Sequence, residues 1–303
     1  MTWHFGSPLS EQRLMSEGFG LSVLTDREVF EITGPDRHSW LHNLTTKSFV
    51  GVSRGDARSG LILDPNGRIK YVFHGVETGE SFLAWTEPGM SGPLVDWLDK
   101  MRFMTQVATV QRPDLEVVWV GSKEEAQFNE SPSRASEVGD GSEFFIPRET
   151  PIAATVGEWA FTALRIAAGI PQISIDTDEL TIPNELGLYA TDWGKGCYPG
   201  QETVAHVHNL GRIPRRLVLL NLDGAEERLP EFGSRIFAGD SEVGRVASSA
   251  YHFELGAIGL ALIKRATPVD AVLSVDGIPA AQDALVDPDV GEHFKAPGLR
   301  RLL

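Results

Sequence analysis

The most informative stretch of this chain is Lys195-Gly196-Cys197-Tyr198-Pro199-Gly200-Gln201-Glu202, or KGCYPGQE. Its glycines, together with Gly194, predict a tight turn in which the backbone approaches another part of the molecule closely. A lysine beside a cysteine favours the thiolate, the form of the side chain that acts as a nucleophile and as a metal ligand. The structural alternative is a glycine-rich turn around a small buried cysteine.

The bulk composition is that of an ordinary globular protein. The chain has 303 residues, more than one hydrophobic core usually holds, so two or three structural units are expected. The hydrophobic fraction is 42%, the charged fraction is 23% and the formal net charge is −15. Such an acidic chain repels phosphate backbones, so we expect no direct binding of nucleic acid. Arg212, Arg215 and Arg216 form its best basic cluster.

Cys197 is the single cysteine of the sequence. A lone cysteine forms no internal disulfide and cannot hold a metal cluster by itself, and its use here fits a reducing cytoplasm. Residues 1–10 lack a basic region followed by an apolar core, so no signal peptide is expected. No apolar stretch is long enough to span a membrane. The sequence therefore predicts a cytoplasmic protein, and we expect a monomer.

Periodicity predicts an α+β body followed by an all-β unit. Helices are expected after Gly34-Pro35-Asp36, after Ser91 as the N-cap, and over 156–168, where Trp159 lies on the apolar face. The polar stretch 122–141 is interpreted as a long surface connection. Strands are expected over 28–33, 61–63, 68–76, 81–85, 106–111 and 115–120 in the body, and over 217–221, 234–237, 242–247, 257–263 and 271–275 in a barrel or sandwich.

Most standard chemical motifs are absent. There is no P-loop, no dinucleotide-binding glycine fingerprint and no nucleophile elbow. His38 and His42 share one face of a predicted helix but lack the glutamate of a zinc protease, so no metal site is expected there. His206 and His208 alternate as on a strand, which favours a partly exposed pair over a metal site.

The eight-residue stretch resembles the K-x-C-[FY]-x-G-Q-E signature of the YgfZ proteins, a branch of the glycine-cleavage T-protein (GcvT) superfamily. Gly196, Tyr198, Gly200, Gln201 and Glu202 complete the match around Lys195 and Cys197. The similarity continues elsewhere, in the stretches 34–46, 67–68, 164–171, 182–186 and 244–248. In the stretch 164–171, Ala167 replaces an acidic residue that is usual in the family.

The resemblance implies a three-lobed fold with ferredoxin-like elements and a C-terminal β-barrel. We therefore divide the chain into a folate-binding region at 1–215, with an inner lobe at about 55–150, and a barrel domain at 216–303. It also implies that tetrahydrofolate or a derivative is the cofactor. Glu185 is expected to bind the pterin ring, because a carboxylate accepts two adjacent N–H groups at once. Arg215 or Arg216 is expected to bind the glutamyl carboxylates, and Tyr71, Trp193 or Trp40 to stack on the ring.

One departure from the T-proteins bears on activity. Working T-proteins carry an aspartate shortly after the first hairpin, whereas here Lys70 and Tyr71 occupy that place. Without a general acid–base carboxylate, aminomethyl transfer should be crippled unless Asp64 or Asp192 compensates. We therefore expect a folate-binding accessory protein that supports assembly or repair of iron–sulfur enzymes, tRNA-modifying ones included, with Cys197 as a functional thiol helped by Lys195. The alternative is a tetrahydrofolate-dependent aminomethyltransferase or demethylase.

Overall fold

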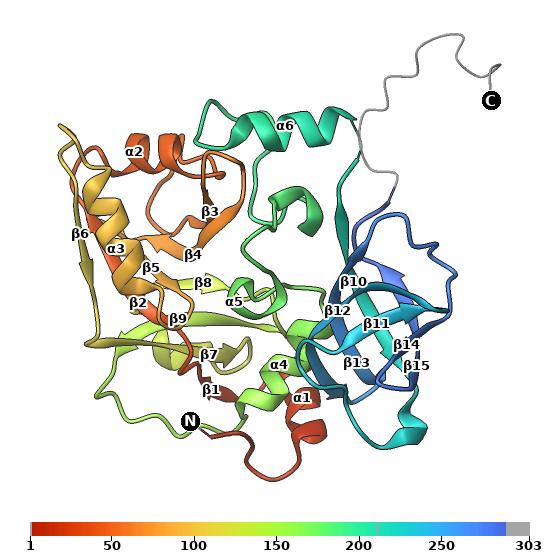
Figure 1. Cartoon of the computed structure of the whole chain (residues 1–303). Helices are drawn as coiled ribbons and strands as arrows, with labels where there is room; N and C mark the ends of the chain where they lie inside the picture. Colours follow the sequence, from red (N-terminus) through yellow and green to blue (C-terminus); the bar gives the residue numbers. More distant parts are fainter. Residues whose placement is uncertain (1, 211, 289–303) are drawn as a thin grey trace.

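Three β-structures, packed around a common junction, make up the protein (Figure 1). The computed structural model describes residues 2–210 and 212–288. The first β-structure is an antiparallel sheet of five strands in the order β3-β4-β5-β2-β6. Its strands are β2 (Glu28–Thr33), β3 (Ala57–Leu63), β4 (Ile69–Glu77), β5 (Ser81–Thr86) and β6 (Ala108–Gln111).

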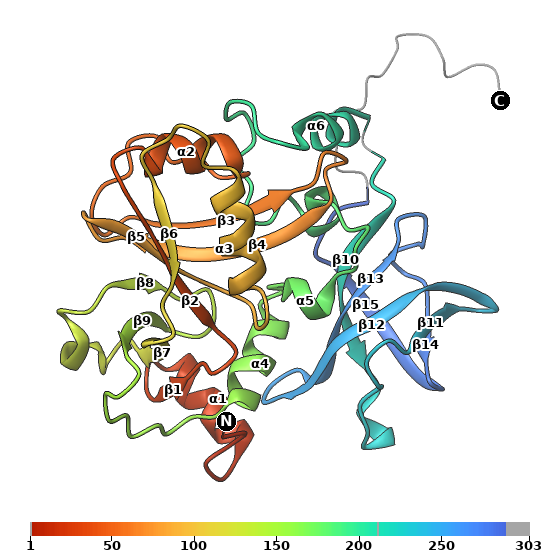
Figure 2. The same ribbon diagram turned by 60° about the vertical axis from the view of Figure 1, so that its left-hand side comes forward.

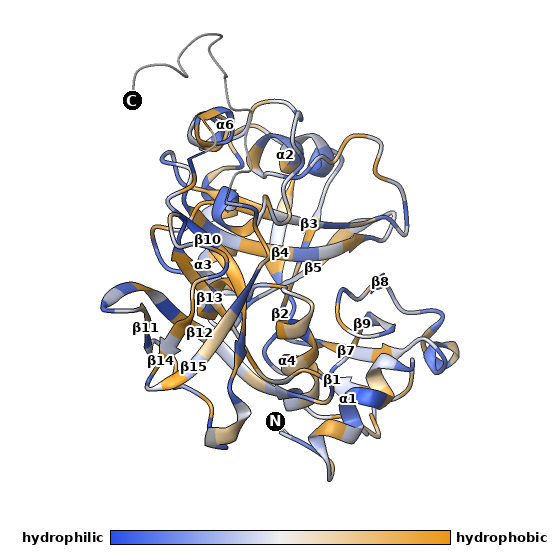
Figure 3. Ribbon diagram, turned by 90° about the vertical axis from the view of Figure 1, so that its right-hand side faces the viewer, coloured by the Kyte–Doolittle hydropathy of each residue, from blue (hydrophilic) through white to orange (hydrophobic). Residues whose placement is uncertain are grey.

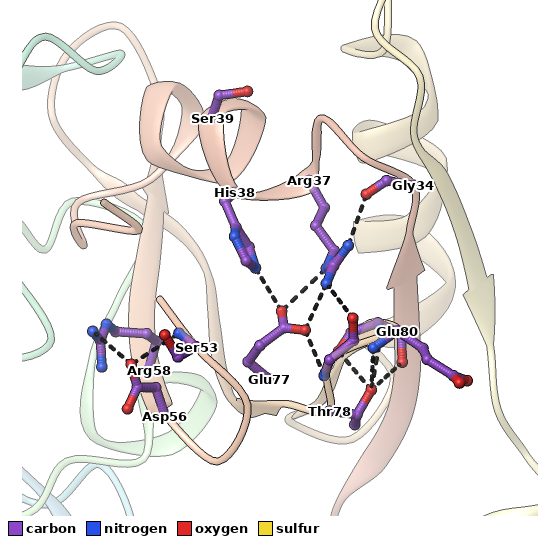
Figure 4. A network of polar contacts seen from close by, with 12 residues as sticks. Gly34, Arg37, His38, Ser39, Ser53, Asp56, Arg58, Glu77, Thr78 and Glu80 are labelled. Carbon is purple, nitrogen blue, oxygen red and sulfur yellow. Dashed lines mark hydrogen bonds and ion pairs between the residues drawn. The ribbon is translucent and has the colours of Figure 1, made fainter. Parts of the chain in front are cut away.

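Helices α2 (Arg37–Leu44) and α3 (Ser91–Lys100) cover one face of this sheet (Figure 2). The interface is built from aromatic and branched side chains that include Phe30, Trp40, Phe73, Phe82 and Leu94. The start of α2 is fixed by Glu77, the last residue of β4. Its buried carboxylate accepts hydrogen bonds from Arg37 Nη2 at 2.6 Å and contacts His38 Nε2 at 2.6 Å (Figure 4). Burial alone would raise the pKa of Glu77, but these bonds bring the net pKa below its ordinary value.

The second sheet has the strand order β1-β7-β9-β8. Its strands are β1 (Leu21–Val23), β7 (Leu115–Gly121), β8 (Ser133–Ala135) and β9 (Gly141–Pro147). Helices α1 (Pro8–Ser16) and α4 (Glu158–Ala167) contribute to a core in which Trp119 and Phe161 meet Trp85 of the first sheet. The two sheets therefore share one hydrophobic core, while the 3₁₀ helix η1 (Glu125–Phe128) supplies Phe128 to a second core on the small sheet.

The C-terminal part is a closed barrel in the order β10-β13-β12-β11-β14-β15. Its strands are β10 (Arg215–Leu222), β11 (Arg235–Ala238), β12 (Ser241–His252), β13 (Gly256–Lys264), β14 (Leu273–Val275) and β15 (Ile278–Ala284), with the 3₁₀ helix η3 (Gly224–Glu226) between β10 and β11. Apolar residues line β13 almost throughout (Figure 3). The predicted fold class, an α+β body with a C-terminal all-β barrel, is confirmed. The division at residue 215 stays a prediction.

The segment between the body and the barrel holds α5 (Ile173–Asp176), the 3₁₀ helix η2 (Pro183–Leu186) and α6 (Gln201–Leu210). A junction core joins it to both neighbours. Leu63 and Ile69 of the first sheet, Tyr198 of the KGCYPGQE stretch and Leu260 of the barrel all belong to this core. Within the described residues, no helix combines the length and the apolar character that crossing a bilayer requires.

Several predictions of local structure are wrong. His206 and His208 lie on helix α6 and not on a strand, and His208 packs against Trp193. The stretch 122–141 contains η1 and β8, so it is more than a connection. Ser91 does not cap α3 with its side chain; instead the carboxylate of Glu28 accepts the N–H groups of residues 89 and 91.

Two further differences concern side-chain exposure and the barrel. The Trp159 side chain is half-exposed and does not belong to the core that α4 makes with the sheets. Strand β15 was not predicted, because its alternating sequence IPAAQDA carries few large apolar residues.

Candidate functional site

The glycines of KGCYPGQE bring its backbone against the tip of the β3–β4 hairpin. A side chain at Gly200, where φ is +81°, would place its Cβ 2.5 Å from the carbonyl oxygen of Asp64. Gly67, with φ +79°, would meet Thr203 of α6 at 2.8 Å in the same way. Only glycine allows such contacts together with a positive φ. The close approach predicted from the sequence is therefore confirmed, and its partner is the hairpin turn at 64–67.

Lys195 reaches away from the cysteine segment toward the carboxyl end of α2. Its Nζ donates hydrogen bonds to the carbonyl oxygens of His42 and, at 2.6 Å, of Thr45. These carbonyls belong to the last turn and C-cap of the helix, where the negative end of the helix dipole lies. Burial lowers the pKa of Lys195 to about 8, while the nearby Asp192 and Cys197 act in the other direction and raise it.

Cys197 itself is exposed, and His42 is close to its loop. A Cβ on Gly196 would lie 3.5 Å from His42 Nε2, in ordinary contact. His42 Nδ1 accepts the backbone N–H of Phe49 at 3.3 Å. Burial lowers the pKa of His42, and the charge of Lys195 adds to the effect, so the neutral form of the ring is favoured. Among the described residues no group of three metal-ligating side chains occurs, here or elsewhere.

The chain before Lys195 is held to the same part of the first lobe. Thr46, which is fully buried, donates its hydroxyl to the carbonyl oxygen of Ala190 at 2.8 Å and accepts the N–H of Leu61. Asp192 pairs with Lys47 Nζ at 2.6 Å. Asp192 is thus engaged by this contact and does not line the cleft described below. We call residues 190–197 the cysteine strap.

Glu185 was predicted to bind a pterin, and its surroundings give it another partner. The side chain is only 1% exposed. Its Oε1 accepts hydrogen bonds from the backbone N–H of Arg215 at 3.1 Å and from Arg215 Nε at 2.9 Å. Its Oε2 accepts from Arg215 Nη2 at 2.9 Å and from the N–H of Ile182 at 3.3 Å. Each oxygen therefore has both of its lone-pair positions engaged.

The predicted folate-tail residues are also occupied. Arg215 forms ion pairs with both Asp178 and Glu185. Burial alone would lower the pKa of Arg215, but these two carboxylates keep it above its ordinary value. Arg216 is 0% exposed and bonds to Gln282 inside the barrel, so its predicted contact with a ligand is wrong. Adjacent residues of a strand point to opposite faces, which sends Arg215 outward and Arg216 inward. Trp193 is 51% exposed and packs against His208, away from the cleft-lining residues.

Tyr71 does lie in a cleft. A cavity of about 460 Å³ opens between β4, the end of β5 and α5. Its lining residues include Tyr71, whose ring also packs against Trp97, and Arg68 and Lys70, which the sequence-based choice of ligand residues missed. No hydrogen bond or ion pair engages these two cationic groups within the part of the chain that the structure describes. The sequence feature that could have identified Arg68 and Lys70 is their position directly after the Asn66-Gly67 turn.

Carboxylates line the same cleft, among them Asp64, Glu87 and Asp178. Glu87 accepts the N–H groups of Ile173 at 2.6 Å and Ser174 at 2.5 Å. Burial nevertheless raises its pKa above the ordinary value. A raised pKa is typical of carboxylates that transfer protons, and sequence reasoning missed Glu87 because it follows β5 without any motif.

Behind Glu87 the first two lobes meet in a polar cluster. Glu143 accepts hydrogen bonds from Trp85 Nε1 at 2.8 Å and from Arg134 Nη1 at 2.9 Å. His74 stacks on Trp85 with ring centroids 4.2 Å apart. Burial, assisted by the charges of Arg134 and Arg27, lowers the pKa of His74 well below its ordinary value. Together with Glu87, this cluster lines a separate, smaller pocket, and its polar groups bond chiefly to one another.

Known proteins are similar to this chain in sequence or in fold. The chain is 24% identical over 264 residues to the tRNA-modifying protein YgfZ of Aliivibrio fischeri, an alignment that covers 78% of this chain and 82% of the relative. It is 24% identical to the iron-sulfur cluster assembly factor IBA57 of Mus musculus, covering 73% and 75%. It superposes on the glycine cleavage system aminomethyltransferase T of Bartonella henselae with a TM-score of 0.80 at 16% identity, covering 96% and 92%. No family model matches the chain.

The cysteine motif, these relatives and the shared fold agree. In its motif, its sequence relatives and its fold, the chain resembles the YgfZ-type proteins of the GcvT superfamily. Lys195 and Cys197 lie on the cysteine strap, while Tyr71 and Glu87 lie in the cleft. Neither Glu185 nor Cys197 lines that cleft. The hairpin β3–β4 joins the two places, since its tip contacts Gly200 and its second strand lines the cleft.

Proposed function

We propose that this protein binds a folate in the cleft beside β4 and supports the assembly or repair of iron–sulfur enzymes, including tRNA-modifying ones, through the thiol of Cys197. The observation that carries the proposal is the exposed Cys197 in a complete KGCYPGQE motif, held against the lobe that also forms the cleft. The names of the YgfZ and IBA57 relatives support the iron–sulfur part.

The cleft suits the chemistry of a reduced folate. Tyr71 lies among the lining residues as the aromatic side chain nearest to a bound planar ring, beside its contact with Trp97, and Arg68 and Lys70 add positive charge for glutamyl carboxylates. The carboxylates of Asp64 and Asp178 are already engaged, by the backbone N–H of Arg68 and by the Arg215 side chain. Their repulsion of an anionic ligand is therefore weaker than that of unpaired carboxylates. In this proposal Arg68 and Lys70, in place of Arg215 and Arg216, bind the glutamyl carboxylates.

Titration calorimetry with tetrahydrofolate and with 5-formyltetrahydrofolate tests the folate part. Arg68→Met and Lys70→Met are each expected to weaken binding about tenfold, as loss of one charge-assisted contact does. Lys100→Met on helix α3, outside the cleft, is the matched control and should bind as the parent does. Absence of measurable binding to both folates would remove the folate from the proposal.

The iron–sulfur part is tested in cells that lack this protein. Plasmid-borne parent protein is expected to restore the activity of an iron–sulfur enzyme, and Cys197→Ser is expected not to. Because Cys197 is exposed, the serine variant should melt at the parent's temperature, which purified protein shows directly. Full restoration by the serine variant would make the cysteine structural and contradict the proposed thiol role.

One observation favours the alternative, a tetrahydrofolate-dependent aminomethyltransferase or demethylase. Glu87 is a carboxylate in the cleft whose pKa is raised by burial, as a general acid or base requires. That reading predicts turnover of an N-methylated amine in the presence of tetrahydrofolate, lost in Glu87→Gln. Folate binding without such turnover favours the accessory role.

A further inference from the structure

The side chain of Lys195 is engaged two residues before the cysteine. Its ammonium group donates to the carbonyl oxygens of His42 and Thr45, both at the carboxyl end of α2. Carbonyls in the last turn of a helix have no N–H partner within the helix, and they carry the negative end of its dipole. The lysine therefore supplies what this helix end lacks, and its nitrogen is directed to α2.

The other contacts of the cysteine strap lie further from the thiol. Ala190 is held by the hydroxyl of Thr46, and Asp192 by Lys47 and the N–H of Ser48. After Asp192, Lys195 makes the next hydrogen bonds to the first lobe among those of the described residues. Beyond Cys197 the chain is fixed again where Tyr198 enters the junction core. Between these two anchors the thiol stands on a short exposed piece of chain.

We propose that Lys195 is a positioning residue, whose ammonium group fixes the Cys197 loop to the carboxyl end of α2 and so determines where the thiol is presented. The inference rests on the proposed role of the Cys197 thiol. It adds to the expectation that Lys195 favours the thiolate, since Cys197 lies close enough to affect the pKa of the lysine. Both hydrogen bonds described for the ammonium group go to carbonyls of α2, so the lysine also holds the loop by geometry.

His42 completes this arrangement. Its Nδ1 accepts the N–H of Phe49, so in the neutral ring the proton lies on Nε2. Nε2 lies within ordinary contact distance of the position that a Cβ on Gly196 would take. The carboxyl end of α2 thus presents a pair of carbonyls to Lys195 and the edge of the His42 ring to Gly196.

The charge of Lys195 gives the arrangement a pH dependence. The titratable groups near its ammonium are Asp192 and Cys197 on its own segment and His42 on α2, and the ring of Tyr198 lies 4.9 Å away. With a pKa lowered to about 8, the ammonium is charged at pH 7 and largely neutral at pH 9. The charge-assisted part of both hydrogen bonds is then lost, and the loop should detach more often.

Electron paramagnetic resonance tests the proposal, because the single cysteine accepts a nitroxide label without competition. Labelled Cys197 in the parent is expected to give a restricted spectrum at pH 7. Lys195→Met should raise the ratio of mobile to restricted label about tenfold, the change expected when one charge-assisted hydrogen bond is lost. Lys195→Arg, which keeps the charge and the donors, should restore most of the restriction. Lys100→Met, at the last turn of α3, should leave the spectrum unchanged.

The pH change supplies a second measurement on the unmutated chain, in case Lys195→Met fails to fold. Raising the pH of the labelled parent from 7 to 9 should increase the mobile component, and Lys195→Arg should not respond. A restricted label in Lys195→Met, or a parent spectrum that stays the same at pH 9, overturns the proposal. The label reports loop geometry without folate or an iron–sulfur partner, so failure of the proposed function leaves this result unaffected.

Discussion

Replacing Glu185 by alanine is expected to destabilise the protein strongly in the absence of any ligand. The carboxylate accepts two hydrogen bonds from the Arg215 side chain and two from backbone N–H groups, and it is 1% exposed. Removing one partner of a buried ion pair costs about 3–5 kcal/mol. Arg215 is a quarter exposed and keeps Asp178, so we take the lower end, about 3 kcal/mol.

Urea unfolding, followed by tryptophan fluorescence, measures this change. Glu80→Ala, at an exposed turn, is the matched control and should shift the unfolding free energy by less than about 0.5 kcal/mol. Asp178→Ala removes the half-exposed partner of the same arginine and should cost about 1 kcal/mol or less. If Glu185→Ala unfolds within about 0.5 kcal/mol of the parent, the buried pair is not structural. The carboxylate would then again be a candidate for the pterin.

Three further predictions concern the contacts that hold the site together. Thr46→Val should lower the unfolding free energy by about 2–4 kcal/mol in the same urea assay, because it leaves the carbonyl of Ala190 and the N–H of Leu61 unpaired; Thr46→Ser should cost much less. Gly67→Ala should lower the unfolding free energy by about 1–3 kcal/mol, because the added Cβ would collide with Thr203 at a position of positive φ. Gly51→Ala is the control: Gly51 has a similar φ but open space around it, so only the backbone strain should lower the stability. Arg215 lowers the pKa of Asp178 to about 2 from 3.8, so this contribution to stability is present above pH 3.8 and is lost as the pH falls toward 2; Asp178→Asn should flatten that acid limb, and an unchanged limb would contradict it.

The sequence was most informative where a residue type permits one conformation. Gly200 required a close backbone approach, and the approach exists. Its partner, the hairpin tip at 64–67, could not be foreseen, because contacts between distant parts of a chain depend on how the lobes pack. For the same reason, the sequence could not predict the hydrogen bonds of Lys195 to the end of α2 or the position of Glu87 in the cleft.

Two errors were avoidable in physical terms. Arg215 and Arg216 directly precede the predicted strand 217–221, and extending that strand by two residues, as β10 does, sends one of them outward and the other into the barrel. The alternation of His206 and His208 covers three residues, too few to distinguish a strand from a helix, and Gly200 followed by Gln201 and Glu202 is equally consistent with a helix start. Glu185 shows the opposite limit, because a carboxylate that suits a pterin suits a guanidinium equally well.

The tip of the β3–β4 hairpin contacts the cysteine motif and also borders the cleft. On one side its glycine lies flush with Gly200 and Thr203, and on the other its next residues, Arg68 and Ile69, form a wall of the cleft. The backbone of this tip cannot move freely, since a Cβ added at Gly67 would collide with Thr203. A substitution that reshapes the cleft by bending the tip must therefore also displace the cysteine motif.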